Sequence, residues 1–212
     1  MNTRADHARK HPEAAPKARE PLRLNLGCGH RHIQGFLNVD KYPACQPDQV
    51  VDLERFPWPW PENAVAEVLM IHVLEHLGAA TDTYLRLMRE LWRVCAPGAT
   101  VRIVVPHPRH DSYLNDPTHV RPVTGDGLLM FSQQANREWL AAGAANTPLG
   151  LYLGIDFALE HTELELDPWW QTRLAEGHVT QEQVFEAMRR ENNVIRQATY
   201  TLRAVKEAAG AA

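Results

Sequence analysis

The chain contains 212 residues, of which 44% are hydrophobic and 23% are charged, and its formal net charge at pH 7 is -4. A chain of this length can bury about 70% of the surface that it exposes when unfolded, so it needs no cross-link to fold. The acidic balance gives no sign of a broad basic surface, although a local basic groove stays open, and we expect no nucleic acid partner. The three cysteines, Cys28, Cys45 and Cys95, form no CxxC, which argues against a zinc knuckle and a disulfide framework.

Residues 1–20 differ from the rest of the chain because they mix charged residues with alanine and proline and offer no apolar face. We predict that they form a disordered tail and that residues 21–212 form a single domain. No run of 18 apolar residues occurs, and no apolar signal-peptide core lies near Met1. We therefore expect a cytoplasmic protein with no membrane partner.

The first predicted strand, residues 22–26, runs directly into the glycine pair Gly27-Cys28-Gly29. Glycine accepts a positive φ and lets the backbone approach a ligand, so a GxG after a parallel strand can hold a cofactor at the carboxyl edge of the sheet. A second strand, residues 36–40, ends on Asp40, whose carboxylate can accept two hydrogen bonds from a ribose diol. A tight turn followed by a surface acid would give the same pattern, so the GxG alone does not establish a cofactor site.

The middle of the chain alternates strand and helix patterns. A short apolar run at 50–53 predicts a third strand. Residues 65–73 are almost all apolar, which predicts a strand buried on both faces of a parallel sheet. Residues 81–94 carry apolar side chains at helical spacing, and residues 100–105 predict the next strand. This order is typical of an α/β fold with a parallel sheet.

The proline-rich loop at 56–61 cannot form a helix or a central strand, because its three prolines remove backbone donors and fix φ. Its two tryptophans, Trp58 and Trp60, are expected to pack on the protein itself rather than on a ligand.

The last third of the chain predicts four further elements. These are a helix at 127–140, a long strand or hairpin arm at 151–166, a helix at 180–193 that starts with a capping box, and a closing edge strand at 198–206. Residues 168–180 are interpreted as a connection with one short helical turn.

Taken in order, the segments LNLGCG, NVD, VDLERFPWP, IHVLEHL, RELWRVCAPGATVRIVVP and LRAVK resemble the class I S-adenosylmethionine-dependent methyltransferases. They look most like the small predicted methyltransferases with a shortened first crossover. The resemblance covers residues 22–206. It implies a Rossmann-like fold with a mostly parallel sheet of about seven strands and an antiparallel edge strand, and it implies S-adenosyl-L-methionine as the cofactor.

The resemblance also assigns roles at the GxG. Asn25, Gly27, Cys28 and Gly29 match the first motif of the family, which wraps the methionine part of the cofactor. The family usually has an acid where this chain has Asn25. An amide can accept a hydrogen bond there, although it cannot neutralise the ammonium group.

Five further positions match residues of the family. Asp40 matches the acid that holds the ribose hydroxyls, and Asp52 with Leu53 matches the pair beside the adenine. His72 falls where the fourth motif borders the cofactor near its sulfonium. His76 matches a histidine that is frequent in families of this kind, in either a structural or a chemical role.

The first crossover is unusually short, because only ten residues separate Gly29 from Asp40. A crossover with a full helix needs a dozen or more residues, so we predict a single helical turn at 31–35. In a dinucleotide fingerprint the third glycine would fall at His32, which argues against a dehydrogenase.

The segment 106–124 follows a predicted strand and is rich in histidine and aspartate, as expected of a substrate-binding loop. We predict O-methylation of a small-molecule or saccharide acceptor, with His119 or His110 as general base and Asp111 orienting the imidazole. Three other side chains are the expected substrate contacts: Tyr113, Arg121 and Arg109.

Other interpretations of this loop stay open. Its metal-ligand candidates are His107, His110, Asp111 and His119, but an extended loop does not fix a coordination geometry, so we predict no metal. The histidines could also be present only to form hydrogen bonds within the loop and at helix caps, with no catalytic role. The chain could also be a non-catalytic S-adenosylmethionine-binding protein or a partner subunit of another enzyme. The strand at 151–166 and the edge at 198–206 leave surfaces for a possible homodimer.

Overall fold

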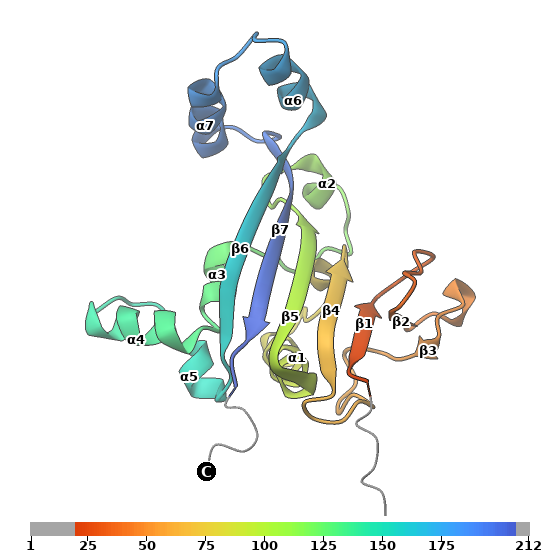
Figure 1. Ribbon diagram of the computed structural model, residues 1–212. Coiled ribbons are helices and arrows are strands. Elements are labelled where there is room, and N and C mark those ends of the chain that lie inside the picture. Colours follow the sequence, from red (N-terminus) through yellow and green to blue (C-terminus); the bar gives the residue numbers. More distant parts are fainter. Residues whose placement is uncertain (1–19, 207–212) are drawn as a thin grey trace, which may run out of the picture.

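The computed structural model describes residues 20–206 (Figure 1). The predicted disordered tail lies outside the described residues except for Glu20. Seven strands form one sheet in the order β3-β2-β1-β4-β5-β7-β6. Their bounds are β1 Leu22–Leu26, β2 Leu37–Asp40, β3 Gln49–Val50, β4 Val65–Ile71, β5 Cys95–Pro106, β6 Phe157–Leu166 and β7 Ile195–Ala204. The predicted α/β class with a mostly parallel, seven-stranded sheet is confirmed.

Seven α-helices and two short 3-10 helices connect the strands within the described part of the chain. They are η1 Pro43–Cys45, η2 Leu74–His76, α1 Thr81–Val94, α2 Asp111–Leu114, α3 Gly125–Leu129, α4 Gln133–Ala141, α5 Leu149–Leu153, α6 Pro168–Ala175 and α7 Gln181–Arg190. The predicted range of α1 is confirmed. So is the capping box of α7, in which the side chains of Thr180 and Gln183 each bond the other residue's backbone N–H.

The antiparallel strand, β7, lies inside the sheet rather than at its edge. It pairs along its length with β5 on one side and with β6 on the other. The prediction of an antiparallel edge strand at 198–206 is therefore wrong in position. At this end of the sheet the edge strand is β6, which carries Glu160, Glu163 and Glu165. Two of these acids, Glu160 and Glu165, pair with Arg203 and Arg196 of β7.

Three other segments differ from their predictions. The expected helix at 127–140 is divided into α3 and α4, because Ser132 caps α4 through the backbone N–H of Ala135. The expected strand at 151–166 begins as α5 and becomes β6 only after Gly154, whose φ of 65° ends that helix. Residues 168–180 contain the two-turn helix α6, which starts at a proline and is capped by Asp167.

The first crossover contains no helical turn, so the prediction of one at 31–35 is wrong. Two hydrogen-bonded turns replace it, closed by Arg31 N–H to the Cys28 carbonyl (2.8 Å) and Phe36 N–H to the Ile33 carbonyl (3.2 Å). Ten residues are too few for a helix and both of its connections.

One face of the sheet lacks a helical cover. Parallel crossovers are right-handed, so connections that run from β1 toward β3 cross one face and those from β4 toward β6 cross the other. Only the second group contains α-helices, and Figure 1 looks onto the open face with α1 behind the strands. On that face Glu67, Leu69 and Ile71 of β4 are half-buried, and Arg102 of β5 is exposed. The prediction that 65–73 is buried on both faces is therefore wrong.

The aromatic loop at 56–61 packs inward, as the sequence predicts. Trp58 and Trp60 are 2% and 4% exposed and belong to the main core, together with the buried face of α1 and the inner side chains of the strands. No helix of residues 20–206 is long and apolar enough to cross a membrane.

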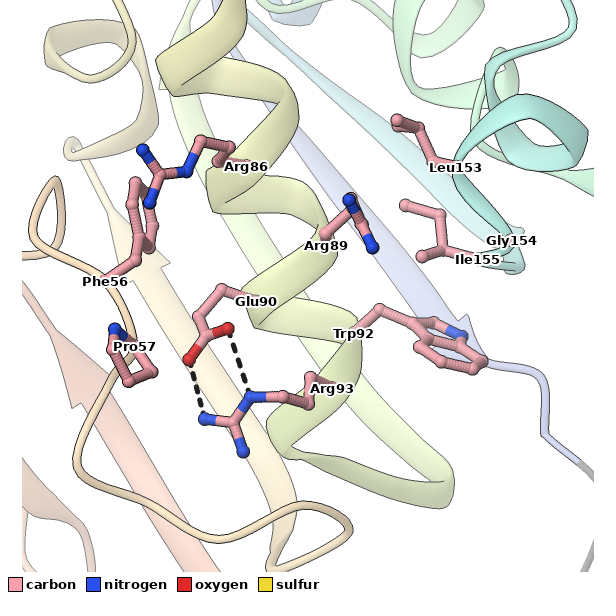
Figure 2. Close-up of a pocket in the computed structure, with 10 residues that line it drawn as sticks. All are labelled: Phe56, Pro57, Arg86, Arg89, Glu90, Trp92, Arg93, Leu153, Gly154 and Ile155. Atoms are coloured by element: carbon pink, nitrogen blue, oxygen red, sulfur yellow. Dashed lines mark hydrogen bonds and ion pairs between the residues drawn. The ribbon is translucent and has the colours of Figure 1, made fainter.

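One carboxylate anchors this loop to α1. Glu90 Oε1 accepts hydrogen bonds from the backbone N–H of Trp58 (2.6 Å) and from Arg93 Nη2 (2.6 Å), and Oε2 accepts from Arg93 Nε (3.0 Å). Figure 2 shows this two-point pair. Burial raises the pKa of Glu90, but the hydrogen bonds from Arg93 and Trp58 outweigh it and hold the pKa below its ordinary value.

A cavity of about 430 Å³ lies beside this pair, between the loop, α1 and the residues after α5 (Figure 2). Arg86 lies over the ring of Phe56, with its guanidinium carbon 4.8 Å from the ring centroid, and Trp92 bonds the Asp156 carbonyl. None of the residues that line this cavity comes from the GxG or from the segment 106–124. These contacts join α1 to the aromatic loop and to the residues after α5.

We predict that Glu90→Gln lowers the free energy of unfolding by about 2–3 kcal/mol at pH 7, because a buried charge-assisted pair is broken. Since the pKa of Glu90 is depressed in the folded state, the carboxylate stabilises above its unfolded pKa, and this contribution is lost as the pH falls through the folded value. Denaturant unfolding at pH 7 and at lower pH measures both effects.

The matched control is Glu186→Gln, which breaks the exposed pair with Arg190 on α7. It should change stability by at most about 0.5 kcal/mol. An equal loss in both variants would contradict the anchoring role of Glu90.

Candidate functional site

A pocket of about 350 Å³ lies at the carboxyl edge of β1, β2 and β4, where open α/β sheets bind ligands. Its walls come from the GxG turn, the ends of β2 and β3, and the residues that follow β4. It is lined by Gly27, Asp40, Lys41, Tyr42, Val51, Asp52, Leu53, His72, Val73, His76, Leu77 and Thr118. Five of the eight cofactor residues predicted from the sequence are in this lining: Gly27, Asp40, Asp52, Leu53 and His72.

Gly27 is required by the backbone and by space. Its φ is +64°, and a Cβ atom there would lie 2.6 Å from Cγ2 of Val73. A side chain would therefore strain the turn and collide with the opposite wall of the pocket. The glycine keeps the first strand and the segment after β4 in contact.

Asp40 presents a fixed carboxylate to the pocket. Oδ2 accepts the backbone N–H of Gly29 and Oδ1 accepts that of Tyr42, both at 2.9 Å, and the residue is 9% exposed. A carboxylate has about four lone-pair sites, so two remain for a ligand. Gly29, which does not line the pocket, holds Asp40 in position.

Asp52 and Leu53 form another part of the wall. Asp52 Oδ1 accepts the backbone N–H of Glu54 (3.1 Å), and Oδ2 lies 3.3 Å from Arg55 Nε. Its side chain is 37% exposed, whereas Leu53 is 5% exposed. The pair offers a polar group beside an apolar surface, which suits a flat base with an amino substituent.

Asn25 lies beneath the turn and not in the pocket lining. Its Nδ2 donates to the Arg31 carbonyl (2.8 Å) and to Asn38 Oδ1 (3.0 Å). Both donors of the amide are therefore used inside the protein. Cys28 is also buried, and burial together with Asp40 raises the pKa of its thiol to about 11, so the thiol stays protonated at neutral pH.

A second cavity, of about 320 Å³, adjoins the first and shares His72 and His76 with it. The other residues lining it come from η2, from β7 and from the segment 106–124. They are Glu75, Pro106, Ser112, Asp116, His119, Arg196 and Gln197.

His119 is the histidine of the segment 106–124 that reaches this second cavity. Its Nδ1 donates to the Tyr113 carbonyl (2.8 Å), and its ring stacks on that of Tyr113 with centroids 5.1 Å apart. The ring centroids of His76 and His119 lie 4.6 Å apart. Nε2 of His119 lies 3.7 Å from Asp116 Oδ2. Burial raises the pKa of Tyr113, so its hydroxyl stays protonated.

His110 is placed differently. Its Nδ1 accepts the backbone N–H of Ser112 (3.0 Å) at the start of α2, and its Nε2 lies 3.2 Å from Asp167. The carboxylate beside His110 is thus Asp167, and among the described residues no hydrogen bond joins the exposed Asp111 side chain to either His110 or His119. Both ring nitrogens of His110 are used in joining α2 to the end of β6.

The two arginines expected to contact substrate bond to backbone carbonyls. Arg109 donates to the carbonyls of Met188 and Arg189 at the end of α7. Arg121 donates to the Gly78 carbonyl (2.9 Å) and lies over the ring of Tyr84. Neither lines the two adjoining cavities.

The structure brings together a different metal-ligand set from the one that the sequence suggested. Of His107, His110, Asp111 and His119, only His119 belongs to a cluster of ligand atoms within the described chain, and its partners are Glu75 and His76. Sequence reasoning missed Glu75. The available signal was an acid in VLEHL, in the middle of apolar residues directly after a buried strand.

Comparison with solved structures identifies the fold. An S-adenosylmethionine-dependent methyltransferase from Archaeoglobus fulgidus matches with a TM-score of 0.58, covering 87% of this chain and 86% of its own at 18% identity. A second such methyltransferase, from Mesorhizobium loti, covers 86% of this chain and 90% of its own, also at 18% identity, with a TM-score of 0.46. No protein-family model and no curated protein matches the sequence. The fold is that of the class I S-adenosylmethionine-dependent methyltransferases, as the sequence motifs predict.

We predict that Asn25→Asp lowers the free energy of unfolding by about 2–3 kcal/mol, because a carboxylate would face the Arg31 carbonyl and Asn38 Oδ1 without a donor. Urea unfolding measures the loss, with the exposed Asn146→Asp as control, which should stay within about 0.5 kcal/mol of the parent. Unchanged stability of Asn25→Asp would show that this amide does not hold the turn.

Proposed function

We propose that this protein is an S-adenosylmethionine-dependent methyltransferase whose cofactor binds in the pocket of Gly27, Asp40, Asp52 and His72. The observation that carries the proposal is Asp40, a carboxylate fixed by two backbone N–H groups and turned to a pocket at the carboxyl edge of the sheet. The fold shared with a named methyltransferase of this kind supports it.

The pocket fits such a cofactor in its donor chemistry. Asp40 has free lone pairs for ribose hydroxyls, and Asp52 with Leu53 offers a polar group and an apolar wall for adenine. Gly27 leaves room for the methionine part, while Asn25, Cys28 and Gly29 would act from beneath by holding the turn and Asp40. His72 stands at the boundary between the two cavities, where the methyl group would leave the cofactor.

The proposed reaction is O-methylation of a small-molecule or saccharide acceptor in the second cavity. The bound cofactor supplies a methyl carbon already activated by the sulfonium, so the protein has to orient the acceptor and remove its proton. His119 is the histidine of the segment 106–124 that this cavity offers as general base. Because its Nδ1 donates to a carbonyl, its Nε2 is free to accept a proton.

His110 is the less suitable of the two histidines predicted as base, because Ser112 and Asp167 occupy both of its nitrogens. Tyr113 supports the choice of His119 by stacking on its ring. The polar lining of the cavity, with Arg196, Gln197 and Asp116, suits an acceptor rich in hydroxyl groups.

We predict that Asp40→Asn raises the dissociation constant for S-adenosylmethionine about 10–100-fold, since charge-assisted hydrogen bonds to the ribose are lost. Isothermal titration calorimetry on the purified protein measures this. Asp82→Asn, an exposed acid at the start of α1, should bind as the parent does. Failure of the parent to bind the cofactor would refute the proposal.

We predict that His119→Ala lowers methyl transfer about 100-fold or more without weakening cofactor binding. The assay follows labelled methyl groups from the cofactor into small molecules of a cell extract. His161→Ala, on the exposed edge strand, is the control and should keep its activity. If His110→Ala loses as much methyl-transfer activity as His119→Ala, the assignment of His119 as general base fails. Cofactor binding without any transfer would instead indicate a non-catalytic binding protein.

A further inference from the structure

Glu75 is a buried carboxylate without a hydrogen-bond donor. It is 1% exposed, and neither Oε atom has a hydrogen-bond partner among the described residues. The nearest cationic candidate, His72, places Nδ1 3.5 Å from Oε1. An uncompensated buried carboxylate costs several kcal/mol, so this position calls for a positive charge.

Two histidines converge on Glu75. Glu75, His76 and His119 each place one oxygen or ring nitrogen so that these atoms lie within 4.8 Å of one another. Glu75 and His76 belong to η2 after β4, whereas His119 belongs to the loop that follows α2. The backbone N–H of Val120 donates to the Glu75 carbonyl (2.9 Å) and holds the two segments together.

The outer hydrogen bonds leave the same nitrogen free in both rings. Thr118 Oγ1 donates its proton to Asp116 (2.6 Å), so it accepts from Nδ1 of His76 (2.9 Å). Nδ1 of His119 donates to the Tyr113 carbonyl. Nε2 of each neutral ring therefore keeps its lone pair. Metal-ligating histidines are held in this way, with the second ring nitrogen bonded to a carbonyl or another polar group.

We propose that Glu75, His76 and His119 bind one divalent first-row transition-metal ion, with Zn²⁺ as the reference ion. Two imidazoles and one carboxylate, with a further position open, form a donor set typical of catalytic zinc sites. Bonds of about 2.0–2.2 Å give donor separations of about 3.4 Å in a tetrahedron. Side-chain movements of about 1 Å would close the present cluster to that size.

All three residues line the second cavity, so a ligand in that cavity could reach the open coordination position of a bound ion. An acceptor hydroxyl bound there would lose its proton more readily, because a metal ion lowers the pKa of a coordinated oxygen. This role rests on the proposed function, whereas the binding of the ion does not. With the ion present His119 is a ligand and no longer the proton acceptor, and His72 is the nearest other histidine on the boundary of the two cavities.

The first test is metal binding by the purified full-length chain after treatment with a chelator. Calorimetry with Zn²⁺ and the visible spectrum with Co²⁺ should show one tightly bound ion in a low-symmetry site. Glu75→Gln and His119→Gln should each weaken Zn²⁺ binding at least 100-fold, and His161→Gln should leave it unchanged. No stoichiometric binding, or binding that survives both substitutions, overturns the proposal.

The second test separates a ligand from a residue that only supports the fold. In the metal-free protein Glu75→Gln should raise the melting temperature, because it removes a buried carboxylate that accepts no hydrogen bond. Added Zn²⁺ should raise the melting temperature of the parent and not that of the variant. If Glu75→Gln melts lower than the metal-free parent and Zn²⁺ has no effect on the parent, Glu75 is structural and the proposal fails.

The third test keeps this inference distinct from the proposed function. If S-adenosylmethionine binds and methyl transfer continues in the presence of chelator, the role of the ion in the reaction fails and His119 remains the base, while the first test alone decides whether the ion binds. If Zn²⁺ binds through Glu75 but the cofactor does not bind, the methyltransferase proposal fails and the metal site stands. Transfer that is lost with chelator and restored by Zn²⁺ supports methyl transfer and the role of the ion in it, and His119 is then a ligand and not the base.

Discussion

The hydrogen bonds of Asn25, Asn38 and Asp48 take the place of the first crossover helix, and the site depends on them. Asn38 Oδ1 accepts from Asn25 and from the backbone N–H of Ile33 (2.8 Å), and Asp48 Oδ2 accepts both the backbone and the side-chain N–H of Asn38. A helix satisfies its own backbone, whereas an irregular loop needs side chains to do so. This network does it for the short loop and fixes the turn that presents Gly27 and Asp40.

The missing helix also explains the open face of the sheet. Without an apolar cover, that face carries cross-strand pairs of opposite charge, Arg23 with Glu67 and Arg203 with Glu160. The guanidinium of Arg23 also lies 4.1 Å from the ring centroid of Phe36, which comes from the short loop. Each exposed pair contributes little to stability, but together they keep a half-uncovered sheet polar. The core is therefore built on one face, between the sheet and α1.

Local patterns could be predicted from the sequence, and long-range ones could not. The limits of α1, the capping box at Thr180 and the position of Gly27 follow from periodicity and backbone chemistry within a few residues. The place of β7 inside the sheet depends on its pairing with two strands distant in sequence. Likewise, Asp167 pairs with His110 across 57 residues, a distance at which no local pattern distinguishes it from the neighbouring Asp111.

The two cavities meet at the turn after β4, and the backbone there is not relaxed. His72 has a φ of 56°, in the left-handed region that a histidine seldom adopts, and its N–H donates to the Val104 carbonyl of β5 (2.8 Å). This conformation ends β4 and begins the turn that carries Glu75 and His76. Strained residues persist where the surrounding structure over-determines them, which is frequent at functional sites. The same turn thus places one histidine between the cavities and directs a buried acid toward His119, so a change in its backbone would disturb both sites together.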